Sequence, residues 1–215
     1  MIRSVVTMMY VVSDTHFFDK NLLGVDQFAP RPFKNVSEMN ATIVNNWNER
    51  VNEDDLVFHL GDIAVNYTKP PRLGDEQVYQ ILQELHGRLI LIKGNHDRRD
   101  LFKYLANHNY KINDKPKFEF HDVGKLIKYN HQQLYMTHYP MMLGIAPQIL
   151  NLHGHIHHYM VPNESNINVG IDAPELDLLK RRPKFGAPIL LREVDEIAQK
   201  KQVLLQKAKK DGETN

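Results

Sequence analysis

The chain has 215 residues, a length that suits one domain with a substantial core, and we expect residues 1–215 to form that single domain. Charged residues (25%) and apolar residues (42%) occur in the proportions of ordinary globular proteins, which excludes disorder along the whole chain. The formal net charge of +1 gives no general attraction for nucleic acid or an anionic membrane, and the absence of cysteine excludes disulfides and thiolate metal sites.

The first half of the chain predicts strands that alternate with helices. Val5–Ser13 is a β-branched apolar run and predicts a buried strand, and the Gly- and Pro-containing stretch 17–36 predicts a long loop. The further elements predicted here are a helix over about 38–50 with Ser37 as its N-cap, a strand over Leu56–Leu60, a loop over Val65–Gly74, a helix over about Asp75–His86, a strand over Arg88–Lys93 and a short helix over 99–107.

The second half predicts short strands without long helices between them. They are Phe118–Phe120, Leu126–Tyr129, Leu134–Thr137, Ile149–Leu152, Ile167–Val169 and Ile189–Leu191. A Lys-rich helix with a partial apolar face follows at about 192–210. Two packed sheets with flanking helices account for both halves, so the predicted fold class is α/β (α+β).

Five short polar clusters lie at or just past the C-terminal ends of predicted strands. They are Asp14-x-His16, Gly61-Asp62, Gly94-Asn95-His96-Asp97, His138 and Gly154-His155-x-His157. Ligand sites of open α/β sheets gather at the carboxyl ends of strands, so we expect one shared site. Side chains two residues apart in an extended segment point the same way, and the glycines allow sharp turns and close backbone approach.

The donor types predict a pair of divalent cations. Oxygen and imidazole ligands without thiolate favour manganese, iron or zinc over calcium. Asp14 and Asp62 contribute about −2 against about +4 from two ions, and the remaining positive charge would attract a phosphate and stabilise a bound hydroxide. We therefore expect two metal ions, manganese first, with iron, zinc, nickel and magnesium as alternatives.

The order D-x-H, G-D, G-N-H-D, H, G-H-x-H resembles the calcineurin-like metallophosphoesterase superfamily. All five motifs are present between Asp14 and His157, about two-thirds of the chain. The surrounding stretches SDTHFF, RPF, NWN, HLGD and LHGH resemble small bacterial and phage-encoded members. The resemblance implies a four-layer α-β-β-α sandwich of two mixed β-sheets flanked by helices.

The resemblance also implies a role for each matching residue. It gives two groups of metal ligands that share a bridging Asp62. They are Asp14, His16, Asp62 and His157 for the first metal, and Asp62, Asn95, His138 and His155 for the second. His96 would be the catalytic histidine that assists the leaving oxygen, and Asp97 would orient it.

Other histidines near the motifs admit more than one interpretation. His138 is preferred as a ligand over His121 and His131 because it directly follows a strand and precedes a Pro turn. His59 and His153 lie one strand step outside the motifs, where each suits either a residue that orients a ligand or a hydrogen-bonded core histidine.

Three arginines could reach a substrate phosphate. Arg31 lies in the loop after the first cluster, and Arg98 and Arg99 follow the GNHD turn. Arginine suits bidentate phosphate contacts, but a structural or solvated role is favoured for each of them.

We therefore predict a dinuclear metal-dependent phosphoesterase. A hydroxide that bridges the metals would attack phosphorus, and His96 would act as general acid on the departing alkoxide. Phosphomonoesters and phosphodiesters both suit this chemistry, and a small diester or nucleotide is slightly favoured because the groove is expected to be built by short loops. The alternatives are a non-catalytic metal-binding scaffold of the same fold and a nuclease acting on short oligonucleotides.

The sequence favours a cytoplasmic protein with a small phosphate ester as its partner. No run of 18 or more apolar residues predicts a membrane span, and the first apolar run ends in S-D-T-H rather than in a signal-peptide cleavage site. The lack of cysteine fits a reducing compartment. No membrane partner and no strong nucleic-acid signal are predicted, and the oligomeric state is left open.

Overall fold

A mostly parallel sheet forms the first layer of strands in the computed structural model, which describes residues 7–24, 29–144 and 148–213. Its order is β11-β1-β2-β3-β6, and only β11 runs antiparallel to its neighbour. The strands are β1 (Met9–Val12), β2 (Leu56–His59), β3 (Arg88–Ile92), β6 (Phe118–His121) and β11 (Ile189–Leu190). The inner strands β1, β2 and β3 are almost entirely apolar because both faces of the sheet are covered there.

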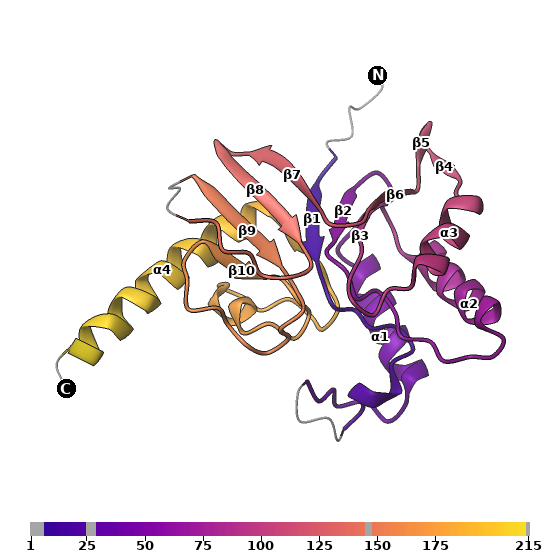
Figure 1. The fold of residues 1–215 in the computed structure, drawn as a ribbon, viewed down its shortest axis with the longest axis horizontal. Helices are drawn as coiled ribbons and strands as arrows, with labels where there is room; N and C mark the ends of the chain where they lie inside the picture. Colours follow the sequence, from indigo (N-terminus) through magenta and orange to yellow (C-terminus); the bar gives the residue numbers. More distant parts are fainter. Residues whose placement is uncertain (1–6, 25–28, 145–147, 214–215) are drawn as a thin grey trace.

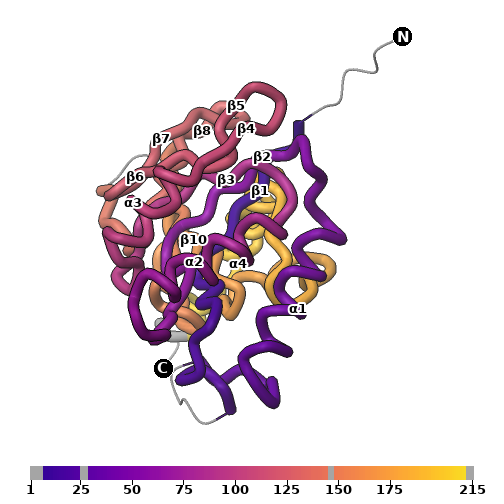
Figure 2. Tube along the Cα trace, turned by 90° about the vertical axis from the view of Figure 1, so that its right-hand side faces the viewer, coloured from indigo at the N-terminus to yellow at the C-terminus, as the bar shows by residue number. Residues whose placement is uncertain are grey.

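Three helices cover one face of this sheet. They are α1 (Val36–Asn48), α2 (Pro71–Glu84) and α3 (Arg99–Asn107). Figure 1 shows them on one side of β1–β3, and Figure 2 shows the molecule from the side of these helices. Trp47, Ile43 and Leu82 pack there against Val57 and Leu91, so this helical layer has its own apolar core.

A second sheet packs on the opposite face of the first. Its order is β10-β9-β8-β7, made of β7 (Gly124–Tyr129), β8 (Gln132–Thr137), β9 (Ile149–His153) and β10 (Asn166–Asn168). Val11, Phe58 and Ile90 of the first sheet share a core with Leu134 and Leu152 of the second. The predicted sandwich of two mixed sheets with flanking helices is confirmed.

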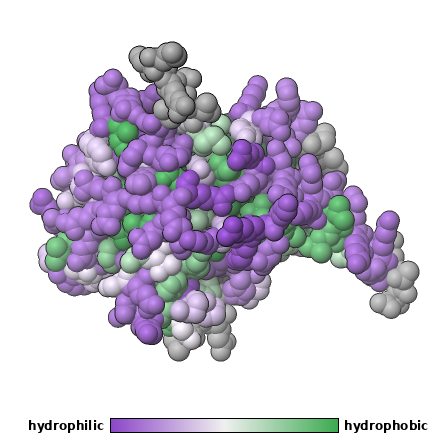
Figure 3. Space-filling view, turned by 180° about the vertical axis from the view of Figure 1, so that it is seen from behind, coloured by the Kyte–Doolittle hydropathy of each residue, from purple (hydrophilic) through white to green (hydrophobic). Residues whose placement is uncertain are grey.

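The long C-terminal helix joins this inter-sheet core. α4 (Leu191–Glu213) buries Leu191, Val194 and Ile197 there, together with the short 3-10 helix η2 (Pro174–Leu178). No helix in the described ranges combines the length and the apolar character needed to cross a membrane. The rear face in Figure 3 is mostly hydrophilic, with hydrophobic side chains in small separate patches.

Several boundaries differ from the sequence-based expectation. The N-cap of α1 is Asn35, not Ser37, because the Asn35 side chain accepts a hydrogen bond from Glu38 N at 2.9 Å. α2 begins at Pro71, which suits the first helical turn, and Gly74 therefore lies within the helix. The sequence also gave no indication of the hairpin β4 (Lys111–Ile112) and β5 (Lys115–Pro116) or of the 3-10 helix η1 (Lys20–Leu22). Val5 and Val6 of the first predicted strand lie outside the described residues.

A buried ion pair ties α4 to η2. Lys201 and Glu175 are both fully buried, with Nζ and Oε1 2.8 Å apart, and Lys201 Nζ also donates to the Asn166 carbonyl at 2.6 Å. Lys201→Met should lower the free energy of unfolding by about 3–5 kcal/mol, because it leaves the Glu175 carboxylate buried without its cation. Urea unfolding followed by circular dichroism measures this.

The neighbouring lysine provides a matched control. Lys200 is 45% exposed and pairs with Glu196, so Lys200→Met should cost about 0–1 kcal/mol. The double variant Lys201→Met/Glu175→Leu should recover most of the lost stability. Equal losses for Lys200→Met and Lys201→Met would contradict the structural importance of the buried pair.

Candidate metal centre

The predicted ligands converge where the carboxyl ends of strands from both sheets meet. β1, β2 and β3 of the first sheet and β8 and β9 of the second each lead into one polar cluster. Six predicted ligands form two groups, within each of which the donor atoms lie within 4.8 Å of one another. The groups are Asp14, His16 and His157, and Asp62, His138 and His155. These are the two ligand groups that the resemblance implies, apart from the amide of Asn95 and the sharing of Asp62.

The two features of the implied ligand set that remain are the amide of Asn95 and the sharing of Asp62. Asn95 Oδ1 lies 2.8 Å from His138 Nε2 and 2.8 Å from His155 Nδ1, so it faces the second group. Asp62 Oδ2 lies 3.5 Å from His16 Nε2 and 3.4 Å from His138 Nε2. The Asp62 carboxylate thus stands between the two groups, where a bridging ligand would have to be.

The backbone at the ligands adopts an uncommon conformation. Asp14, His16, Asp62, His155 and His157 have φ values of 58°, 47°, 52°, 73° and 47°. Left-handed φ is uncommon for residues other than glycine, and such residues cluster at functional sites. The chain turns sharply at the ligands, which brings side chains from separate strands to one place.

Two glycines allow the loops to approach closely, as the sequence predicted. A Cβ atom at Gly94 would lie 2.2 Å from Asp62 Oδ1, and one at Gly154 would lie 2.3 Å from Asp14 Oδ2. Either contact is far inside van der Waals distance. Only glycine lets the main chains pass so near the two carboxylates.

His16 shows that the site suits a metal. Its Nδ1 lies 3.2 Å from Asp19 Oδ2, whereas its Nε2 is buried and has no hydrogen-bond partner in the described part of the chain. Burial lowers the pKa of His16, which favours the neutral imidazole that binds metals. A buried imidazole nitrogen without a partner is costly, and a cation held with Asp14 and His157 would satisfy it.

His157 is oriented by a carboxylate that sequence analysis did not identify. His157 Nδ1 lies 3.0 Å from Asp172 Oδ2, so Nε2 is the ring atom that would bind a metal. Burial opposes ionisation of Asp172, but the charge of Arg31 and the hydrogen bond from His157 lower its pKa to about 2. Asp172 follows the end of β10 in the stretch Gly170-Ile171-Asp172, which is the placement that singled out the other clusters.

Arg31 has a structural role rather than an exposed, substrate-binding one. It is 1% exposed, and its guanidinium donates to Asp172 Oδ2 at 2.6 Å, to the Asp14 carbonyl at 2.7 Å and to the Thr15 carbonyl at 2.8 Å. Arg31 therefore anchors both the first ligand loop and the carboxylate that orients His157. Of the other two arginines, Arg98 pairs with Asp75 and Arg99 begins α3 in an exposed position.

Asp19 offers a direct test of ligand orientation. Asp19→Asn should weaken manganese binding at the first group by about 10–100-fold, because the amide orients His16 less strongly than the carboxylate does. Titration of the metal-free protein with manganese, followed by calorimetry, measures the two affinities. Asp100→Asn, at an exposed residue that pairs with Lys103, should change neither affinity. An unchanged first affinity in Asp19→Asn would exclude this role.

His96 and Asp97 occupy the turn after β3. His96 is exposed, its ring centroid lies 5.4 Å from that of His16, and its main-chain N–H donates to Asp62 Oδ1 at 2.9 Å. The Asp97 carboxylate accepts hydrogen bonds from Gly94 N at 2.8 Å and Ile63 N at 2.9 Å, and burial raises its pKa to about 6. These contacts hold the turn that carries His96, and direct orientation of the His96 ring by Asp97 stays a prediction.

His59 and His153 are buried and hydrogen-bonded. Thr15 Oγ1 donates to the Ile63 carbonyl at 2.9 Å, so at 2.8 Å it accepts from His59 Nε2. Burial lowers the pKa of His59 to about 3 and that of His153 to about 4, which keeps both rings neutral. His59 thus supports Thr15, between two ligands, while His153 Nδ1 bonds to the Gly154 carbonyl at 2.9 Å.

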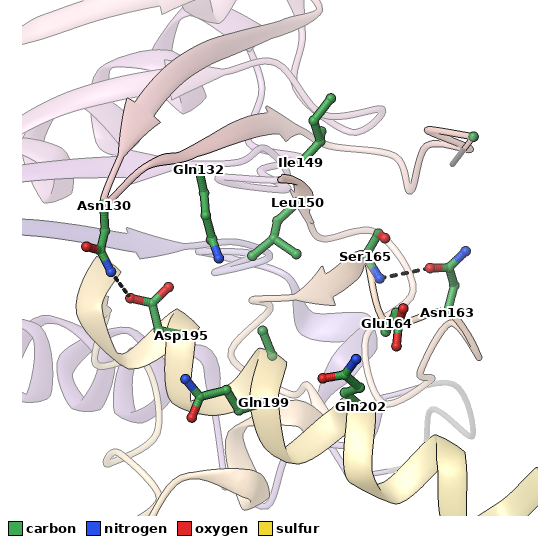
Figure 4. A pocket seen from close by; sticks show the side chains of 12 residues that line it. Asn130, Gln132, Ile149, Leu150, Asn163, Glu164, Ser165, Asp195, Gln199 and Gln202 are labelled. Atoms are coloured by element: carbon green, nitrogen blue, oxygen red, sulfur yellow. Dashed lines mark hydrogen bonds between the residues drawn. The ribbon is translucent and has the colours of Figure 1, made fainter. Parts of the chain in front are cut away.

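The cavity in Figure 4 lies away from these residues. Its volume is about 600 Å³, and it is lined by α4, by the beginnings of β8 and β9 and by the loop before β10. None of the predicted ligands lines it. Its charged lining residues are Glu164 and Asp195, which would repel a phosphate. The lining therefore offers an anion no compensating positive side chain.

Comparison with known proteins agrees with this fold and centre. The family model described as calcineurin-like phosphoesterase matches residues 8–206. Protein MJ1445 of Methanocaldococcus jannaschii is 29% identical over 154 residues, 66% of this chain and 83% of that protein. The Gene 66 protein of Mycobacterium phage L5 is 28% identical over 193 residues, 76% of this chain and 86% of that protein.

A solved structure shares the fold. The crystal structure of AQ665 from Aquifex aeolicus has a TM-score of 0.60 at 23% identity and covers 89% of this chain and 100% of that chain. At this level of identity the likeness concerns the fold alone.

Proposed function

Because the chain belongs to the calcineurin-like phosphoesterase family, we propose that it hydrolyses small phosphate esters with the help of two divalent cations, manganese first. The observation that supports this most strongly is the pair of His/Asp groups, with Asp62 of the second group 3.5 Å from His16 Nε2 of the first. Asp14, His16 and His157 would hold one ion with Asp62. Asn95, His138 and His155 would hold the other, again with Asp62. When bound, such ions act as Lewis acids toward phosphate oxygens and lower the pKa of water.

Besides the metal ligands, the site contains a side chain that can donate a proton and residues that hold it in place. His96 is exposed beside both groups and would donate a proton to the leaving oxygen. Its main-chain N–H donates to Asp62 Oδ1 at 2.9 Å, which holds the turn in place. Asp97 would stabilise that turn through its two main-chain bonds. Asn95 would ligate without adding negative charge, which leaves the centre attractive to an anionic ester.

A small diester or nucleotide is the slightly favoured substrate over a phosphomonoester. The test is a screen of the manganese-loaded protein against monoesters, diesters and cyclic phosphates. We expect hydrolysis of at least one class, abolished by removal of the metal and strongly reduced in His96→Ala. Failure on every class with both metals bound would overturn the proposal and favour a non-catalytic scaffold. Activity on short oligonucleotides alone would instead favour a nuclease.

A further inference from the structure

A small cavity opens beside His96 on the side of α2 and α3. Its volume is about 230 Å³, and His96 and Asn95 form part of its wall. Ala64, Val65, Val78 and Leu101 line it with buried apolar side chains. The cavity therefore combines a group able to donate a proton with an apolar interior.

Three polar side chains of this cavity, those of Asn66, Asp75 and Arg98, already have partners. Asn66 Nδ2 donates to Gln77 Oε1 at 2.9 Å, and Asn66 Oδ1 accepts from Thr68 N at 2.9 Å. The Arg98 guanidinium pairs with the Asp75 carboxylate, so the charge of the one arginine among the lining residues is compensated. The cavity thus offers a ligand apolar surface rather than unmet hydrogen bonds or net positive charge. A second phosphate group would gain little here, whereas a flat apolar ring would be well accommodated.

Tyr67 completes the lining from the loop that follows Asp62. Tyr67 is 63% exposed, so its ring is accessible to a ligand that enters the cavity. Exposed aromatic rings provide stacking surfaces for nucleobases that tolerate different bases. The volume lies below the range of about 300–1,000 Å³ typical of pockets for drug-sized ligands, so one ring system is the expected occupant.

We propose that this cavity receives the leaving alcohol of the ester, and that this alcohol carries a flat ring the size of a nucleobase that stacks on Tyr67. The inference rests on the proposed function, because it is the proton-donating role of His96 that places the leaving oxygen at the cavity. In the reaction, the bond between phosphorus and that oxygen breaks, and the oxygen takes the proton of His96. The oxygen of a water molecule bonds to phosphorus, and one proton of that water restores His96. The other proton stays on the inorganic phosphate formed from a monoester, or is released when a diester gives a monoester dianion.

Two substrates that differ only in the base measure the contribution of the ring. Uridine 5′-phosphate and ribose 5-phosphate have like leaving oxygens, and only the first carries a base. We use both compounds as monoesters and as methyl diesters with the manganese-loaded protein. The wild type should prefer the uridine compound in kcat/KM by about 5–100-fold, the range that stacking on an aromatic ring supplies. Adenosine 5′-phosphate should match uridine 5′-phosphate within a few-fold, because stacking on an aromatic ring tolerates different bases.

Tyr67→Ala should abolish this preference, because the rate on the uridine compound should fall much more than the rate on the ribose compound. Tyr159→Ala is the matched control, since Tyr159 is also an exposed tyrosine after a ligand motif but does not line the cavity. It should keep the preference. Equal loss on both substrates in Tyr67→Ala, or no base preference in the wild type, would overturn the proposal and leave the phosphoesterase function intact.

A binding measurement separates the cavity from the chemistry. If the wild type hydrolyses none of these esters, saturation-transfer NMR with uridine and the metal-free protein tests whether the cavity binds the base. Transfer to the base protons that disappears in Tyr67→Ala would support the cavity as a ring site. Absence of transfer in the wild type would exclude it.

Discussion

Asp62→Asn should remove both metals from the protein at manganese concentrations that saturate the wild type, and turnover should fall with metal occupancy. The Asp62 carboxylate lies 3.5 Å from His16 Nε2 and 3.4 Å from His138 Nε2, so a neutral amide weakens both groups together. The affinity at each group should fall by more than the about 10–100-fold typical of residues that only orient a ligand. Metal analysis after gel filtration, with calorimetric titration, measures the loss.

The choice of asparagine keeps the fold of the loop. Asp62 Oδ1 accepts a hydrogen bond from His96 N at 2.9 Å, and the amide oxygen of asparagine can accept the same bond. Burial opposes ionisation of Asp62, but its hydrogen bond with His138 and the charges of His138 and His16 lower its pKa well below the usual range. The carboxylate is therefore charged in the wild type, and the variant removes that charge from the centre.

Asp14→Asn is the matched comparison for Asp62→Asn. Asp14 belongs to the first group alone. Asp14→Asn should therefore lower the affinity for the first metal ion and leave the affinity for the second near its wild-type value. Retention of two metals per chain in Asp62→Asn, or identical losses in the two variants, would exclude a shared role for Asp62.

His96→Ala should lower turnover by about two to four powers of ten while both metals stay bound, because the variant removes the proton donor and none of the metal ligands. The bond from His96 to Asp62 is made by the main chain and survives the substitution. Steady-state kinetics with metal analysis on the same samples measures both quantities. The loss should be larger for alkyl esters than for p-nitrophenyl esters, since p-nitrophenolate departs without a proton.

His131→Asn is a control for the loss of a histidine. His131 is exposed in the turn between β7 and β8 with φ of 63°, a conformation that asparagine tolerates. Its activity should equal that of the wild type. An equal loss for alkyl and p-nitrophenyl esters in His96→Ala would show that His96 does not act as an acid on the leaving oxygen.

The order of the elements and the predicted ligands could be inferred from local sequence. Apolar β-branched runs predict buried strands. Polar clusters directly after such strands lie at the carboxyl ends of the sheet, and this placement does not depend on how the side chains pack. Asp14 and His157, 143 positions apart in the chain, meet for this reason, since β1 and β9 both end at the centre. Residue types compatible with a dinuclear metal site are likewise visible in the motifs themselves.

The tertiary structure decided which residues support the ligands. Arg31 pairs with Asp172, 141 positions away, and no local pattern links them, because such a pair depends on how two loops pack rather than on the periodicity of either. Glu175 beside Lys201 and the cavity at His96 have the same origin. Local sequence determines which residue types lie at the ends of the strands. Side-chain orientation, burial and cavity shape depend on how distant segments pack and exclude water.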